Sequence, residues 1–247
     1  MQLILMTSDN YHKCLNPYLY LFDKYAGLDN FNVTICGFTY DEIAKDACSR
    51  WDVPFYSIGE YADYPVNKWS DAFWNVLNNI AKETFIFALE DYWLFRPVDV
   101  NGMKMLFDYA GQFRNVLKID LAFDRLYING GSTFNYGESD YDNCGYLDLL
   151  KSPPHTPYNM SLWGGIWNRE QMKRFIVPGE KAQEIELFGS GRVDQSNDVL
   201  VLGTRQAPMR HSNIYQSRHN GNPVYFDSGW RIKEVDLEHM RDVGWIG

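Results

Sequence analysis

The sequence predicts a single α/β domain in which helices flank a mostly parallel, mixed β-sheet. Short apolar runs alternate with longer segments whose apolar residues recur at helical spacing, and strands separated by helices imply parallel pairing. The run at 84–89 (TFIFAL) is continuously apolar, as expected of a strand that is covered on both faces. A chain of 247 residues, 45% of them hydrophobic, can bury one substantial core. We therefore treat 1–247 as one domain.

The first ninety residues predict three strand–helix units and a fourth strand. An apolar run at 2–6 ends in the polar Thr7-Ser8-Asp9-Asn10, and helical spacing follows. Ser70 is expected to cap the helix before the apolar run described above. The predicted strands are 2–6, 31–38, 53–58 and 84–89, and the predicted helices are 17–25, 41–51 and 70–82.

The rest of the chain continues the alternation, with one change of character. The segment 124–146 is rich in tyrosine, and its Asn129-Gly130-Gly131 is a strong hairpin signal. The three prolines within 152–157 predict a loop. We expect strands at 115–121 and 199–202 and helices at 100–113, 169–176 and 236–245, the last packed back on the core.

The charge balance limits the partners that the chain can attract. With 23 Lys+Arg against 32 Asp+Glu, the formal net charge is −9, which argues against long-range attraction to nucleic acid. A local basic strip can still outweigh the net charge where a polymer docks. Aromatic residues make up 16% of the chain, more than a core usually needs, so some rings are expected to face a cleft that takes sugars or bases.

The chain shows no sign of a membrane span or of a disulfide framework. There is no run of about 18 apolar residues. The chain also turns polar after its first six residues, which is too soon for the apolar region of a signal peptide. The four cysteines form no CxxC pair and have no metal-finger spacing. We expect a cytoplasmic protein with reduced cysteines.

The sharpest chemical feature is the acidic pair Glu90-Asp91 at the end of the 84–89 strand. Open α/β folds bind ligands at the carboxyl edge of the sheet, and Mg²⁺ or Mn²⁺ typically takes one or two protein carboxylates there together with substrate phosphates. The alternative is that the two acids only cap or solvate the next turn, because acid-rich strand ends are common.

Taken together, the motifs resemble the GT-A class of glycosyltransferases, which transfer a sugar from a nucleoside diphosphate donor. The resemblance covers most of the chain and is greatest to bacterial and phage members. At one position the sequence departs from the class, because Glu90-Asp91-Tyr92 stands in place of its Asp-x-Asp motif. The resemblance rests on the Thr7–Asn10 turn, on Leu89–Trp93, on the block 161–169 (SLWGGIWNR) and on 183–190 (QEIELFGS).

The resemblance implies a donor site in 1–99. Thr7, Ser8 or Asp9 would hydrogen-bond the base or ribose, although a helix N-cap explains the same residues. Asp91 would be the metal ligand, supported by Glu90, with Mn²⁺ or Mg²⁺ neutralising the departing diphosphate. Trp69 is a further candidate for contact with the nucleotide sugar.

The acceptor and the catalytic base would belong to 100–247. Trp163-Gly164-Gly165-Ile166-Trp167 permits close backbone approach at the glycines, and one of the two indoles is expected to stack on the acceptor while the other is core. The resemblance implies a carboxylate base near here, with Glu186 preferred to Glu184. These two glutamates share a face in an extended segment and diverge on a helix, and a solvated first helical turn explains them as well.

A locally basic strip at 205–221 gives the last candidates. Members of the class bring a late-chain histidine or basic residue to the metal or diphosphate, which implies Arg210 as a donor contact and His211 as a metal ligand, with Arg218 and His219 as substitutes. A surface loop with incidental charge is the alternative.

Several readings of function stay open at this stage. The preferred one is an inverting transfer of a hexose or pentose to an acceptor hydroxyl, carried either by a glycan or by a hydroxymethylated DNA base. A non-catalytic carbohydrate-binding module is the alternative, although such modules are usually all-β. A nucleotidyltransferase is weaker, because its glycine-rich, basic phosphate loop is missing from the N-terminal part.

Overall fold

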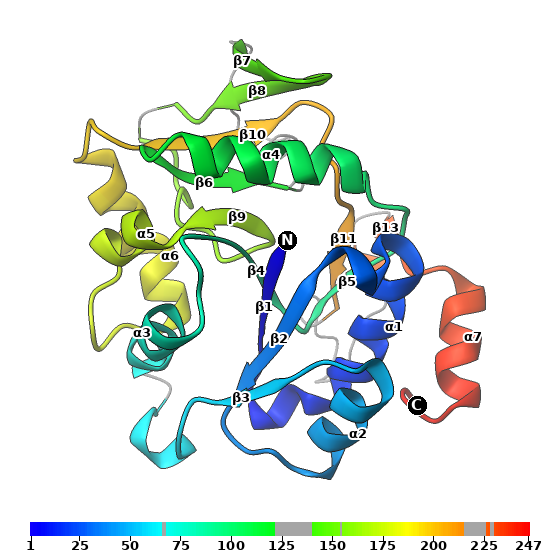
Figure 1. Cartoon of the computed structure of the whole chain (residues 1–247). Helices are drawn as coiled ribbons and strands as arrows, with labels where there is room; N and C mark the ends of the chain where they lie inside the picture. Colours follow the sequence, from blue (N-terminus) through cyan, green and yellow to red (C-terminus); the bar gives the residue numbers. More distant parts are fainter. Residues whose placement is uncertain (66–67, 122–139, 154, 215–225, 228–229) are drawn as a thin grey trace.

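The computed structural model describes residues 1–247 except 66–67, 122–139, 154, 215–225 and 228–229. In this part of the chain, nine strands form one sheet in the order β3-β2-β1-β4-β9-β6-β10-β8-β7, and two small two-stranded sheets pair β5 with β11 and β12 with β13 (Figure 1). The strands are β1 (Gln2–Met6), β2 (Asn32–Gly37), β3 (Phe55–Ser57), β4 (Thr84–Leu89), β5 (Tyr92–Leu94), β6 (Val116–Asp120), β7 (Asp140–Cys144), β8 (Leu147–Lys151), β9 (Gly165–Asn168), β10 (Leu200–Thr204), β11 (His211–Asn213), β12 (Phe226–Asp227) and β13 (Trp230–Arg231).

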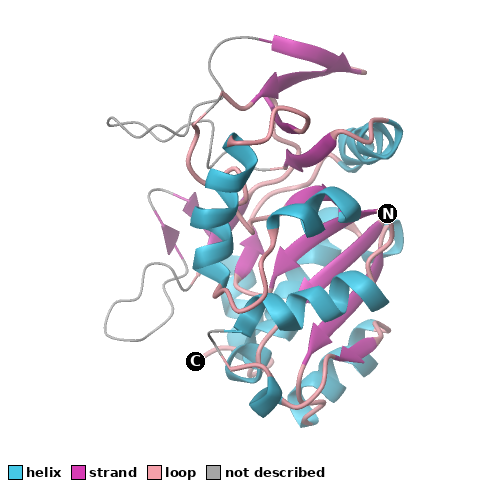
Figure 2. Ribbon diagram, turned by 90° about the vertical axis from the view of Figure 1, so that its left-hand side faces the viewer, coloured by secondary structure: helices cyan, strands magenta, loops and turns pink. Residues whose placement is uncertain are grey.

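Two layers of helices cover the sheet. Side chains alternate along a strand, so Leu3 and Leu5 of β1 face one apolar cluster while Ile4 and Met6 face the other. The first cluster packs against α1 (Leu15–Ala26), α2 (Glu42–Trp51), α4 (Val100–Gln112) and α7 (Glu234–Asp242), and the second against α3 (Trp69–Asn79), α5 (Arg169–Phe175) and α6 (Ala182–Asp194). Figures 1 and 2 show these layers, with the β7–β8 hairpin at the end of the sheet away from α2. The prediction of one α/β domain is confirmed.

The sheet is of the mixed kind. Strands β1, β2, β3 and β4 pair in parallel, and β6 pairs in parallel with β10. Strand β9 runs antiparallel between β4 and β6, and β8 runs antiparallel to β10. The carboxyl ends of β1, β4 and β6 therefore meet the beginning of β9 at one edge, and this edge carries most of the predicted site residues.

The predicted strands and helices are present, with two differences. Ser70 lies inside α3 instead of capping it, because the helix begins at Trp69 after Lys68 and the Ser70 hydroxyl accepts from the Glu180 N–H. Helix α6 was anticipated only as the alternative of a solvated first helical turn, because its exposed Leu187 and Phe188 interrupt the apolar stripe that marks a helix facing a core. The hairpin signal at 129–131 lies outside the described residues.

The remaining sequence expectations concern packing and covalent structure. The four cysteines, all among the described residues, are buried and form no disulfide. The C-terminal helix α7 packs back on the core through Leu237 and Met240, as predicted. None of the helices in the described part of the chain combines the length and apolar composition that a membrane crossing requires.

Candidate active site

Glu90 is buried at the carboxyl end of β4. Only 5% of the residue is exposed, and its backbone carbonyl accepts a hydrogen bond from the Trp93 indole (3.0 Å). Burial, together with the negative charge of Asp91, raises the pKa of Glu90 to about 8, while hydrogen bonding from Ser8 and Thr7 opposes the shift. The acidic pair therefore lies against the turn that follows β1, and burial disfavours the ionised form of Glu90.

The turn after β1 is held mainly by contacts within the protein. Thr7 is buried, and its N–H donates to the Cys36 carbonyl of β2 (2.9 Å). Asp9 accepts from both the N–H and the hydroxyl of Thr39 (3.1 and 2.6 Å). Among the three proposed nucleoside contacts, Thr7 and Asp9 thus connect the turn to β2 and to Thr39 behind it, while Ser8 and Asp9 are both partly exposed.

The late-chain strip is brought next to the acidic pair. Strand β11 pairs antiparallel with β5, and the Ile214 N–H donates to the Asp91 carbonyl (3.0 Å). The His211 ring stands edge-on to Tyr92, with ring centroids 5.0 Å apart, and Trp163 contacts both rings. These contacts join residues that lie about a hundred positions apart in the sequence.

His211 lies in this aromatic cluster as a neutral imidazole. Burial lowers its pKa to about 4, and neither ring nitrogen has a hydrogen-bond partner among the described residues. Arg210 is half-buried immediately before β11, and Trp69 is half-buried against Phe73 and Phe87. Arg218 and His219 lie outside the described residues.

The structure separates the roles of the two tryptophans near β9. Trp167 has no exposed surface and belongs to the apolar core, so the expectation that it could stack on an acceptor is wrong. Trp163 is half-buried and lies at the site edge with Tyr92 and His211. Neighbouring strands decide this difference, because β9 places Trp167 between β4 and β6.

The two glycines that precede Ile166 make room for protein side chains. A Cβ atom on Gly164 would lie 2.5 Å from Met209 Cε, and one on Gly165 would lie 2.8 Å from Lys118 Cε. The space beside these two glycines, where we predicted close approach to the backbone, is therefore occupied by the Met209 and Lys118 side chains.

Helix α6 sends the two candidate bases in different directions. Glu184 accepts from the Lys181 N–H (2.8 Å) and so caps the first turn of its own helix, which was the structural alternative for this residue. Glu186 Oε1 accepts from the Leu162 N–H (2.8 Å), next to Trp163. Burial raises the pKa of Glu186, opposed by the Leu162 N–H and by the charge of Lys118.

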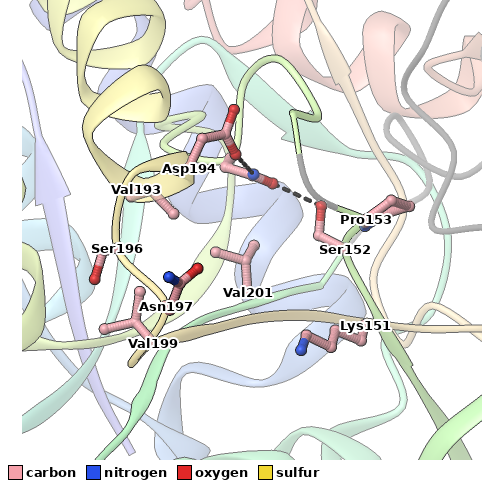
Figure 3. Close-up of a pocket in the computed structure, with 10 residues that line it drawn as sticks. Lys151, Ser152, Pro153, Val193, Asp194, Ser196, Asn197, Val199 and Val201 are labelled. Atoms are coloured by element: carbon pink, nitrogen blue, oxygen red, sulfur yellow. Dashed lines mark hydrogen bonds between the residues drawn. The ribbon is translucent and has the colours of Figure 1, made fainter.

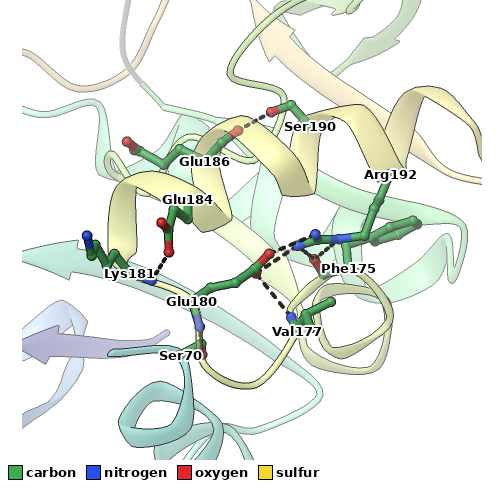
Figure 4. Close-up of polar contacts among 9 residues, drawn as sticks. All are labelled: Ser70, Phe175, Val177, Glu180, Lys181, Glu184, Glu186, Ser190 and Arg192. Carbon is green, nitrogen blue, oxygen red and sulfur yellow. Dashed lines mark hydrogen bonds and ion pairs between the residues drawn. The ribbon is translucent and has the colours of Figure 1, made fainter. Parts of the chain in front are cut away.

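A bidentate ion pair anchors the segment that leads into α6. Arg192 donates to both carboxylate oxygens of Glu180 (2.8 Å each) and to the Phe175 carbonyl (Figure 4). The Glu180 backbone also exchanges hydrogen bonds with Ser70 of α3. These contacts fix the position of α6, and therefore of Glu186, relative to the sheet.

Sequence reasoning missed a buried charged pair in β6. Lys118 has no exposed side chain, and its Nζ lies 2.5 Å from Asp120 Oδ1 and donates to the Ser161 carbonyl (2.5 Å). The signal was available, because VLKIDL places two charges two residues apart in an otherwise apolar strand, so both face one side of the sheet.

The acids at this edge fit a divalent cation only as part of a shared site. Among the residues that the structure describes, no three His, Cys, Asp or Glu side chains gather closely enough to hold a metal ion by themselves. Mg²⁺ and Mn²⁺ commonly take one or two protein carboxylates and complete their shell with water and substrate phosphate. Asp91, with Glu90 behind it, fits a cation that arrives with a diphosphate.

A separate polar pocket of about 120 Å³ lies near the opposite edge of the sheet (Figure 3). It is lined in part by Val199 and Val201, around the start of β10, whereas Asp120 lies at the carboxyl end of the parallel strand β6. Its polar groups satisfy one another, because Ser152 donates to Asn159 and Asn159 donates to Asp194. None of the predicted site residues lines this pocket.

Comparison with known proteins identifies the fold. No protein-family model matches the sequence, and no curated protein matches it. Among solved structures, a mannosyltransferase from Pyrobaculum calidifontis in complex with GDP-Man and Mn²⁺ is similar at 10% identity and a TM-score of 0.53, over 93% of this chain and 58% of that one. Residues 1–349 of S. aureus TarS are similar at 15% identity and a TM-score of 0.48, over 82% of this chain and 59% of that one.

The likeness to the mannosyltransferase shows that this chain has the GT-A type of α/β fold, as the sequence resemblance implied. The chain spans less than three fifths of the length of that mannosyltransferase.

Proposed function

We propose that the protein is a glycosyltransferase that moves a sugar from a nucleoside diphosphate sugar to an acceptor hydroxyl. One observation carries the proposal. The structure gathers an acidic pair (buried Glu90 and partly exposed Asp91), the β1 turn, the late-chain strand β11 and a helix-borne carboxylate, Glu186, around the same edge of the sheet. This is the edge at which open α/β sheets bind their ligands.

The donor would lie in the half of the site formed by 1–99. Asp91 would hold a Mn²⁺ or Mg²⁺ ion, which would neutralise the negative charge of the departing diphosphate. Ser8, with Thr7 and Asp9 behind it, would position the nucleoside, and Trp69 and Arg210 are the further candidate contacts. The mannosyltransferase that shares the fold is in complex with GDP-Man and Mn²⁺, which supports testing this donor and this ion first.

The reaction step would belong to Glu186. The acceptor oxygen attacks the anomeric carbon of the donor sugar, and the bond between that carbon and the diphosphate oxygen breaks. The acceptor proton passes to the Glu186 carboxylate, a general-base step that typically contributes about 10²- to 10⁴-fold in rate. A single displacement of this kind inverts the anomeric centre. A raised pKa suits the role, because a base works best when its pKa lies near the operating pH.

The acceptor would bind on the side of Trp163. We favour a glycan over a hydroxymethylated DNA base, because Arg205, a basic residue of the strip that the structure describes, forms an ion pair with Asp148 (3.5 Å). A glycan acceptor predicts activity that changes little between about 50 and 200 mM salt, whereas binding to a DNA acceptor would fall steeply over this range.

The decisive experiment compares two glutamates of the same helix. With a donor panel that begins with GDP-mannose and Mn²⁺, E186Q should lose about 10²-fold or more in kcat, because it removes the base. E184Q is the matched control and should keep most of the activity, since Glu184 caps its own helix.

Proton NMR of the first product should show inversion of the anomeric centre. A wild-type protein that binds nucleotide sugars but neither transfers nor hydrolyses any of them would favour the non-catalytic binding module. Equal activity of E186Q and wild type would remove Glu186 from the mechanism.

A further inference from the structure

The sheet contains a lysine with no solvent exposure, which is an unusual position for a charged side chain. Lys118 is fully buried on β6, contacts Asp120 and the Ser161 carbonyl, and lies 4.9 Å from the centre of the Trp167 ring. Removing two charges from water is costly even when they pair, and an apolar pair of similar volume is often at least as stable. Stability is therefore a weak reason for a lysine at this position.

The backbone around Lys118 is shaped to admit it. Strand β6 carries one extra residue, Leu117, where its register with β10 shifts, and Lys118 then faces the same side as Trp167 of β9. Opposite Asp120, β9 has Gly165, and a Cβ at that position would clash with the lysine chain at 2.8 Å. Two separate features of the sheet thus accommodate one side chain.

Lys118 and Glu186 form hydrogen bonds with two consecutive residues, Ser161 and Leu162. The lysine ammonium binds the Ser161 carbonyl, and the N–H of the next residue, Leu162, binds the Glu186 carboxylate. Lys118 also acts on Glu186 through its charge. Lys118 is paired with Asp120 on its own strand, while Glu184, the other acid of this part of α6, turns to its own helix cap.

We propose that Lys118 is a positioning residue for Glu186: its ammonium group fixes the Ser161–Leu162 segment that binds the carboxylate, and its charge favours the ionised carboxylate. The inference rests on the proposed role of Glu186 as the base. It assigns Asp120 the opposite effect, because this carboxylate partly neutralises the lysine. Lys118 touches no substrate in this scheme and acts only through Glu186.

The test follows the Glu186 carboxyl by carbon NMR of protein labelled at glutamate Cδ, with E186Q used to assign its signal. In K118M the titration midpoint of Glu186 should rise by about one pH unit or more, since an oppositely charged neighbour has been removed. In D120N it should fall, because the lysine charge is no longer offset. K173M removes a lysine that is paired with Glu170 on α5 and should leave the midpoint unchanged.

Activity supplies an independent reading. The acidic limb of the pH profile of kcat should move upward in K118M and downward in D120N, with little change in KM for the donor. K118R, which keeps the charge, should restore the wild-type limb at least in part.

The outcomes separate the two proposals. A wild type with no transferase activity would contradict the proposed function, while the NMR titration would still decide the link between Lys118 and Glu186. Unchanged midpoints in both K118M and D120N would overturn the inference. If K118M does not fold, the opposite shift in D120N and the charge-retaining K118R carry the decision.

Discussion

At the scale of single residues, burial decides the chemistry of the acids at the site. Glu90 and Asp91 are neighbours in the sequence, but Glu90 points into the protein against Thr7 and Ser8, where its charged form loses solvation. Without this difference in burial, the sequence would offer no reason to prefer one of the two carboxylates as the cation ligand. This difference supports assigning the direct cation contact to Asp91 and a supporting role to Glu90.

The raised pKa of Glu90 predicts a pH dependence of stability in metal-free protein. The unfolded chain releases the proton near its ordinary pKa of 4.5, whereas the folded protein keeps it to about 8. Between these values the folded state holds one more proton, so the free energy of unfolding falls as the pH rises, by at most about 1.4 kcal/mol per pH unit.

Urea titrations of the wild type and of E90Q between pH 5 and 8 measure this effect. In E90Q the decline attributable to Glu90 should disappear, whereas E83Q, which changes an exposed glutamate, should follow the wild type. Parallel curves for the wild type and E90Q would show that Glu90 is ionised throughout this range.

At the scale of elements, helix α6 decides where the two candidate glutamates, Glu184 and Glu186, point. Glu184 and Glu186 have different partners because a helix turns about 100° per residue, so positions two apart point to different sides. One carboxylate caps the helix and the other reaches the Leu162 N–H. The helix itself is placed by Arg192 and Glu180 at its two ends.

The Arg192–Glu180 pair gives a prediction about this element. R192M should lower the free energy of unfolding by about 2 kcal/mol or more, because the largely buried Glu180 carboxylate loses its cationic partner and keeps the hydrogen bond from the Val177 N–H. R174M is the matched control. It breaks an exposed arginine–aspartate pair and should cost at most about 1 kcal/mol.

The position of α6 should respond as well as its stability. Under conditions where R192M is folded, kcat should fall more than the donor KM rises, since α6 carries the proposed base and none of the proposed donor contacts. A variant as stable and as active as the wild type would show that the ion pair does not position α6.

At the scale of the whole molecule, the site is an edge where distant segments meet. Residues from the first strand, from the middle of the chain and from the strip near 211 are adjacent only because β4, β9 and β6 are neighbours and β11 pairs with β5. No single segment contains a complete donor site or a complete catalytic set. Ligand binding should therefore depend on the folded domain as one unit.

A thermal-shift screen tests this edge without any acceptor. A nucleoside diphosphate or nucleotide sugar with Mn²⁺, present at about 100 times its Kd, should stabilise the protein by about 2.7 kcal/mol and raise Tm by several degrees. D91N should abolish the shift, and D198N, which changes an exposed aspartate paired with Arg174, should retain it. If no member of a broad nucleotide panel raises Tm, the proposal of a donor site at this edge is wrong.

The order of the elements could be predicted because its signals are local. Apolar runs of strand length, helical spacing and polar strand ends are visible in short windows, and they located β1, β4 and the acidic pair. Helix α6 escaped because apolar residues such as Phe188 face solvent, which removes the stripe on which such reasoning depends. Lys118 escaped although its partner Asp120 lies on the same strand, because the link to Glu186 runs through Ser161 and Leu162, which belong to another segment of the chain.

The sequence by itself determined the α/β class, the order of its elements and the position of an acidic pair at a strand end, since these follow from the local alternation of apolar and polar residues. Only the tertiary structure decided that Trp167 is core while Trp163 lies at the site edge, that Glu184 caps a helix while Glu186 faces Leu162, and that Lys118 lies beside them. Burial and electrostatic coupling are properties of pairs of segments far apart in the chain, and strand order brings those pairs together.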